Sequence, residues 1–197
     1  MSTFATLKAD IQSWSLRSDY PESIYKLATA QINRGLLVRE MLSDFSATTS
    51  GESVTLPSDF IEFDHVYIDA DPRVVLMAAD QWQQSAFHRS SGQPATYSIK
   101  DGVILLNPVP DGSYSLAGRY YAELADFSAD SDTNDVLTKF PEIYLFANLM
   151  FVYAWLQDAE REVAATNNFM AVVDAANKKD VKARFTGPVR QRARASA

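Results

Sequence analysis

The stretch that decides the fold of the middle of this chain is residues 96–124, TYSIKDGVILLNPVPDGSYSLAGRYYAEL. It opens with two short runs rich in β-branched and aromatic residues, separated by Asp101-Gly102. This pair tolerates the positive φ values of a two-residue hairpin turn. A turn here places four apolar side chains on one face, so turn and pattern agree on a β-hairpin. The predicted cross-strand pairs are Ile99–Ile104 and Tyr97–Leu106.

A longer turn follows this hairpin. Residues 107–112, NPVPDG, predict a wider connection into a third strand over 114–121, which would extend the hairpin into a meander. Short runs rich in Val, Ile and Tyr, punctuated by Gly, Pro, Asp and Ser, already begin at about residue 36. The chain between residues 36 and 121 is therefore predicted to form a small antiparallel β unit.

Helical patterns occupy both ends of the chain. Apolar residues recur at spacings of three and four in a first helix, and again in a second helix that ends at Gly35. Two more helices are predicted, one opened by Pro141 and a last one over about 159–184. The predicted buried stripes of the first two helices are Phe4, Leu7, Ile11 and Trp14, and then Ile24, Leu27, Ala28 and Ile32.

These patterns predict the α+β fold class. A helical bundle formed by the N- and C-terminal helices carries the inserted β unit, and a basic arm extends from the C-terminus. The predicted bounds are 1–36 and 137–184 for the helical bundle, 37–124 for the β unit, 125–136 for an acidic linker, and 185–197 for a docking arm.

The charge of the chain is strongly uneven. Its net charge is −7, but residues 1–177 hold 11 basic and 24 acidic side chains, whereas residues 178–197 hold 7 basic and 1 acidic. The body is therefore expected to repel DNA, and only the end of the chain should attract nucleic acid or an acidic protein surface. The chain has no cysteine, which excludes disulfides, thiol catalysis and Cys-based zinc sites.

The sequence lacks the usual patterns of catalysis and metal binding. His65 lies near Asp64, Asp69 and Asp71, but no second histidine stands at ligand spacing, and a solvated strand edge explains the group better. There is no nucleophilic serine motif and no glycine-rich phosphate loop. We therefore expect no enzyme, no catalytic residue, no metal ligand and no cofactor.

The helix that follows Pro141 is apolar almost all round. Such a helix is covered on most sides, by helices of its own chain or by neighbouring subunits. This helix has more apolar surface than so small a bundle can readily cover, which favours packing between subunits through Tyr144, Phe151 and Trp155. The apolar run from Ile143 to Leu156 is shorter than the roughly 20 residues that cross a bilayer, so we expect no membrane association.

The order of motifs along the chain resembles the adaptor, or head-to-tail connector, proteins of tailed double-stranded DNA bacteriophages. The resemblance spans roughly residues 3–187 and rests on five motifs that occur in order with similar gaps. They are LPSDF (56–60), GQPATY (92–97), PVP (108–110), YY (120–121) and PEIYL (141–145). The chain departs from the family at NDVLTKF (134–140), where relatives often carry a tryptophan.

This resemblance implies a structural virion protein and no enzyme. Such adaptors form a ring, typically of twelve copies, beneath the portal at the capsid vertex, and they extend the DNA channel toward the tail. The implied partners are other copies of the chain, the portal protein, a tail or nozzle protein, and double-stranded DNA that passes without sequence-specific binding. The implied location is the neck of the virion, with the host cytoplasm as the place of assembly.

The basic arm has two interpretations. The resemblance implies that it clasps the portal, with Phe185, Val189, Arg190, Arg192 and Arg194 as docking residues. The arginines would then meet acidic groups of the portal or of a neighbouring subunit. The alternative is a nucleic-acid-binding protein that uses the same tail on DNA phosphates, with an affinity that falls steeply with salt.

Overall fold

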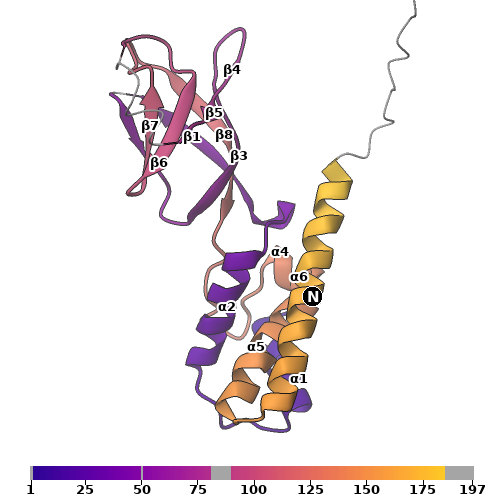
Figure 1. Ribbon diagram of the computed structural model, residues 1–197. Helices are drawn as coiled ribbons and strands as arrows, with labels where there is room; N and C mark the ends of the chain where they lie inside the picture. The colour runs from indigo at the N-terminus through magenta and orange to yellow at the C-terminus, as the bar shows by residue number, and fades with distance from the viewer. Residues whose placement is uncertain (1, 50, 81–89, 185–197) are drawn as a thin grey trace, which may run out of the picture. The chain divides into compact units, whose positions relative to one another are not determined.

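The computed structural model describes residues 2–49, 51–80 and 90–184. The chain divides into two compact units, a helical unit up to Val38 and from Asp126 onward, and a β unit over Arg39–Ala125. The chain thus leaves the helical unit once and returns to it after the β unit is complete (Figure 1). The predicted α+β class, with helices at both ends, is confirmed.

The helical unit is built around one apolar helix. Helices α1 (Phe4–Ser15), α2 (Ser23–Gly35) and α6 (Ala159–Arg184) each pack on α5 (Pro141–Trp155), which follows the short α4 (Asp135–Lys139) (Figure 1). Pro141 occupies the first turn of α5, where its missing N–H has no helical partner to lose. The apolar α5 is therefore covered by helices of its own chain.

The predicted stripes of α1 and α2 are right in part. Ile11 and Ile32 are fully buried, but Trp14 is 56% exposed and Leu27 is 50% exposed. The buried stripe of α1 continues at Ser15, four residues after Ile11. Since a step of three residues turns the other way around a helix than a step of four, Trp14 and Leu27 fall outside the buried sectors.

A side chain of α6 fixes the place where the chain leaves the helical unit. Asn177 Nδ2 donates to the carbonyl oxygen of Gly35 at 2.9 Å, and the Leu37 N–H donates to Asn177 Oδ1 at 3.0 Å. The amide thus replaces the hydrogen-bond partners that the backbone loses at the end of α2.

In the described residues of the β unit, the strands form two four-stranded sheets, with orders β1-β8-β3-β4 and β2-β7-β6-β5. A short 3₁₀ turn, η1 (Arg39–Met41), opens the unit. The strands are β1 (Leu42–Thr48), β2 (Ser53–Thr55), β3 (Phe60–Ile68), β4 (Val74–Val75), β5 (Met77–Ala78), β6 (Thr96–Lys100), β7 (Val103–Asn107) and β8 (Ser115–Ala122). β5 pairs with β6 in parallel, so the second sheet is mixed rather than purely antiparallel.

The core of the β unit lies among inward-facing residues of both sheets. In the first sheet, alternate residues of β3 and β8 are buried, and in the second sheet alternate residues of β7 are buried. This alternation is what two sheets packed face to face require. The buried members are Phe45, Leu56, Val66, Ile68, Leu76, Ile104, Leu106, Leu116 and Tyr120.

The predicted hairpin is confirmed, and the predicted meander is wrong. Asp101 and Gly102 have φ values of 51° and 75°, and β6 and β7 pair in the predicted register. The third strand, β8, pairs instead with β1 and β3 in the other sheet. The connection over 108–114 is too long for a tight hairpin, and it carries the chain from one sheet to the other.

Strands β3 and β8 approach each other closely at Gly118. A Cβ atom at this position would overlap the carbonyl oxygen of His65 and lie 2.9 Å from the Cα of Val66. The register of β3 against β8 shifts between Phe63 and His65, as at a β-bulge. Only glycine allows the two backbones to come this close.

Candidate functional site

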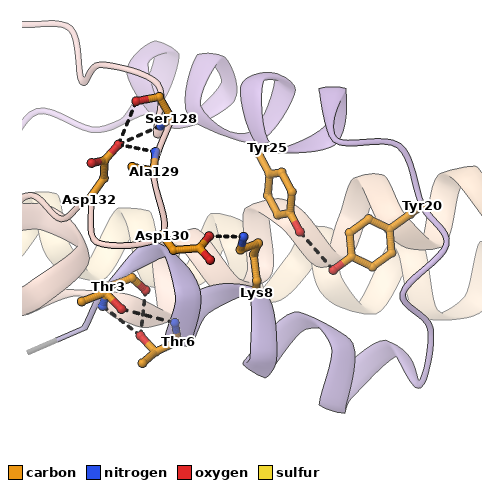
Figure 2. A network of polar contacts seen from close by, with 9 residues as sticks. All are labelled: Thr3, Thr6, Lys8, Tyr20, Tyr25, Ser128, Ala129, Asp130 and Asp132. Carbon is orange, nitrogen blue, oxygen red and sulfur yellow. Dashed lines mark hydrogen bonds and ion pairs between the residues drawn. The ribbon is translucent and has the colours of Figure 1, made fainter.

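A network of polar contacts lies where the returning segment, residues 126–134, meets the start of α1 (Figure 2). The Phe4 N–H donates to the carbonyl oxygen of Asp132 at 2.8 Å, and the Ala5 N–H donates to that of Asp130 at 3.0 Å. The first N–H groups of a helix have no partner within the helix. The returning segment supplies those partners, and so it holds the N-terminus of α1.

Side chains strengthen this junction. Thr3 and Thr6 form a reciprocal capping box at the start of α1. Lys8 forms an ion pair with Asp130 (Figure 2). The ammonium group of Lys8 also lies 4.8 Å from the centre of the Phe4 ring. The stretch predicted as an acidic linker thus contributes contacts to the helical unit.

The Asp132 carboxylate closes a local turn. Its Oδ2 accepts from the N–H groups of Ser128 and Ala129, each at 2.8 Å, and from Ser128 Oγ at 3.1 Å (Figure 2). The bonds from the backbone N–H groups of Ala129 and Ser128 hold the pKa of Asp132 below its usual value. Because Asp132 Oδ2 already accepts three hydrogen bonds from Ser128 and Ala129, its role is to stabilise this turn.

Aromatic rings fill the inner side of the junction. The Phe4 ring stacks on Phe127 at 5.2 Å and meets Tyr25 edge-on at 4.9 Å. The hydroxyls of Tyr20 and Tyr25 lie 3.3 Å apart, and burial raises the pKa of Tyr25. A raised pKa keeps the Tyr25 hydroxyl neutral at physiological pH, so it contributes packing and a hydrogen bond rather than acid–base chemistry.

The residues predicted to pack between subunits lie in different environments. Tyr144 is 1% exposed, its hydroxyl accepts from Asn134 Nδ2 at 2.8 Å, and burial raises its pKa to about 12. Its side chain therefore packs inside its own helical unit. Phe151 is half-buried and Trp155, at the end of α5, is 43% exposed, so these two remain open to a neighbour.

The predicted docking residues of the arm lie outside the described residues. Phe185, Val189, Arg190, Arg192 and Arg194 all follow Arg184, which ends α6. Their docking role stays a prediction.

His65 forms a small surface cluster in the β unit. Its Nδ1 lies 2.9 Å from Asp64 Oδ2, and its ring stacks parallel to Tyr67 at 6.0 Å. Asp69, the next carboxylate along, binds the Arg73 guanidinium at 3.2 Å. Over residues 2–49, 51–80 and 90–184, no three His, Cys, Asp or Glu side chains come together as a metal site would need.

Sequence reasoning did not find a groove in the helical unit. The groove has a volume of about 220 Å³ and lies between α1, α4 and the start of α5. Its apolar lining comes from Leu7, Leu137, Pro141 and Leu145, and its two carboxylates from Asp10 and Glu142. The two acids are 132 positions apart in the sequence, so no local pattern could have paired them.

The helical unit thus combines a packed core, exposed apolar side chains and a groove with two carboxylates, and contacts with other chains could use these surfaces. In the described part of the chain, no helix has the length and apolar character that crossing a membrane requires. The family model described as SU10 adaptor protein matches residues 2–192, and the chain therefore belongs to this family of phage head–tail adaptors. No curated protein matches the chain. As a phage adaptor it is a structural component of the virion that associates with other virion components.

Proposed function

We propose that this chain forms the adaptor ring between the portal of the capsid and the tail, and that the ring extends the DNA channel. The observation that carries the proposal is the family match, which covers residues 2–192 and so includes both units and most of the arm. The ring contains twelve copies, binds the portal on one side and a tail or nozzle protein on the other, and occupies the neck. Assembly takes place in the host cytoplasm.

The charge of the body supports a channel function. Residues 1–177 carry a net charge of −13, from 11 basic and 24 acidic side chains. An acidic wall releases no counterions from DNA and gains no phosphate contacts, so DNA slides past it without sticking. Double-stranded DNA is therefore a passing occupant that is not bound sequence-specifically.

The arm, residues 185–197, is the part that docks on the portal in this proposal. It carries three arginines and no acid, and Phe185 and Val189 add apolar groups. A chain that ends at Arg184 should keep its helical circular dichroism and lose binding to the portal. Unchanged portal binding by the truncated chain would exclude the arm as the docking element.

The alternative function is nucleic-acid binding through the basic tail, and the charge of +6 over residues 178–197 is the observation that favours it. It predicts DNA affinity that falls steeply between about 50 and 200 mM salt. A mobility-shift titration of the full chain beside the chain ending at Arg184 separates the two functions. DNA binding that disappears with the tail supports the alternative, and weak binding by both chains supports the adaptor.

A further inference from the structure

The groove of the helical unit has room for a side chain from another molecule. Its volume is about 220 Å³, and an apolar cavity of about 150 Å³ already accommodates benzene. Leu7 and Leu137 are buried at the floor, and Leu145 is half-buried. An aliphatic side chain placed there would remove apolar surface from water on both molecules.

Two unpaired carboxylates lie beside this floor. Asp10 and Glu142 are exposed, and neither forms an ion pair with any residue that the structure describes. Five other acids of the helical unit do have a basic partner. Those acids are Asp19, Asp130, Asp158, Asp174 and Asp180. The groove therefore suits an apolar side chain with a cation next to it.

The end of α6 presents this combination of side chains. Val181 is 55% exposed, and Lys182 beside it is exposed and without an ion pair among the described residues. Lys178 lies one turn before Val181, and its ammonium group reaches Asp174 at 2.6 Å on the exposed surface. The last turns of α6 thus form a basic surface with one apolar side chain at its centre.

We propose that the end of α6 of one copy docks into the groove of a second copy. Val181 enters the apolar floor beside Leu145, and Lys182 faces Asp10 and Glu142. The inference rests on the proposed function, because it names the surfaces through which the copies of the ring meet.

The groove and the end of α6 are different surfaces, and this difference determines how many copies can join. A contact between unlike surfaces is heterologous, so each copy keeps one free groove and one free α6 end for further copies. Such a contact closes into a ring when the rotation between copies allows it, whereas a contact between like surfaces stops at a dimer. The charge complementarity lies within one chain, and this favours a second copy over the portal as the occupant.

Engineered cysteines test the contact directly, since the natural chain contains no cysteine. The double variant Leu145→Cys/Val181→Cys is oxidised mildly, alone and bound to the portal, and run on a non-reducing gel. A ladder of dimers, trimers and larger species is the expected result, and each single variant should give no ladder. The matched control is Leu145→Cys/Val163→Cys, because Val163 is an exposed valine of the same helix, 59% accessible, outside the proposed contact. A dimer from Val181→Cys alone, or an equal ladder from the control, would overturn the proposal.

Charge exchange gives a second, independent readout. Glu142→Lys and Lys182→Glu should each weaken self-association about tenfold, and the combined variant should recover most of the loss. A combined variant that associates no better than either single one overturns the pairing.

The failures of the two proposals look different. If the wild-type chain assembles, alone or on the portal, but residues 145 and 181 do not cross-link, the contact is wrong and the adaptor ring stands. If the wild-type chain assembles in neither setting, the proposed ring fails and this contact fails with it.

Discussion

The two units of this chain bury their apolar residues in different ways. The core of the β unit lies between two sheets. Val66 and Leu116 come from one sheet, and Ile104 comes from the other. The helical unit wraps three helices around α5 and still leaves Trp155 and Val181 exposed. Apolar side chains are also exposed in the β unit, at Val75 and Met77, so the two units differ in how their cores are built: by two packed sheets in one, and by helices around α5 in the other.

A groove with two unpaired carboxylates and a basic end of α6 both belong to the helical unit. The β unit instead depends on close backbone packing, most of all at Gly118. Changes in the helical unit should therefore alter assembly as well as stability, and changes in the core of the β unit should alter stability.

The largest effect is expected from Gly118→Ala. The added Cβ overlaps the His65 carbonyl, and no rotamer relieves it, so the two central strands must separate at a cost of about 4 kcal/mol. Denaturant unfolding followed by circular dichroism should show the strand signal lost first and the helical signal retained. The control is Gly112→Ala, because a Cβ there meets nothing within 4 Å. Simultaneous loss of both signals would show that the units do not fold separately.

A cavity in the helical unit should come next. Ile143→Ala removes a fully buried side chain of α5 and should cost about 3 kcal/mol, through lost burial and the cavity left behind. The midpoint of the helical transition in denaturant measures the loss. Val163→Ala, on the exposed face of α6, should change the same midpoint by less than about 0.5 kcal/mol. Equal losses for the two variants would contradict the described packing.

Asn134→Ala should have an intermediate effect. Its Oδ1 accepts from the Leu137 N–H at 2.7 Å and caps α4, and its Nδ2 donates to the Tyr144 hydroxyl. Losing the cap and leaving a buried hydroxyl without its donor should together cost about 2 kcal/mol. Asn134→Asp should recover most of this, because a carboxylate keeps the cap and accepts from the Tyr144 hydroxyl. Thermal unfolding of both variants checks the prediction.

The smallest effect concerns Asp132 and pH. Its pKa is lower in the folded chain, so the carboxylate stabilises the fold at every pH above its ordinary value of 3.8, and this contribution disappears as the pH falls through the folded value. The difference in Tm between the wild type and Asp132→Ala should therefore be constant from pH 7 to 5 and vanish in stronger acid. Asn168→Ala, at an exposed position of α6, is the control, because it removes no ionisable group and its effect on Tm should not change with pH. A difference that grows in acid would contradict the role of Asp132.

Local patterns predicted much of this fold correctly. The hairpin at Asp101-Gly102 follows from turn chemistry and alternation, which are both properties of neighbouring residues, and the structure reproduces its register. The last helix, Ala159–Arg184, also has the predicted bounds. These elements depend on interactions between residues that are close together in the sequence.

What the sequence did not predict depends on contacts between distant segments. β8 was expected beside β7, but it pairs with β1 and β3, because a long connection leaves the choice of sheet to tertiary packing. Trp14 fits a helical spacing and is nevertheless exposed. Asp10 and Glu142 line the same groove, which only the packing of α1 on α5 can bring about.

The measurement that tests the central claim most directly is electron microscopy of the full chain mixed with the portal protein of its phage. The account predicts a second ring of twelve copies stacked on the portal, with the channel of the portal continuing through it. A portal without added density, beside a chain that remains a free monomer, would contradict the assignment of this chain as the ring that joins the portal to the tail.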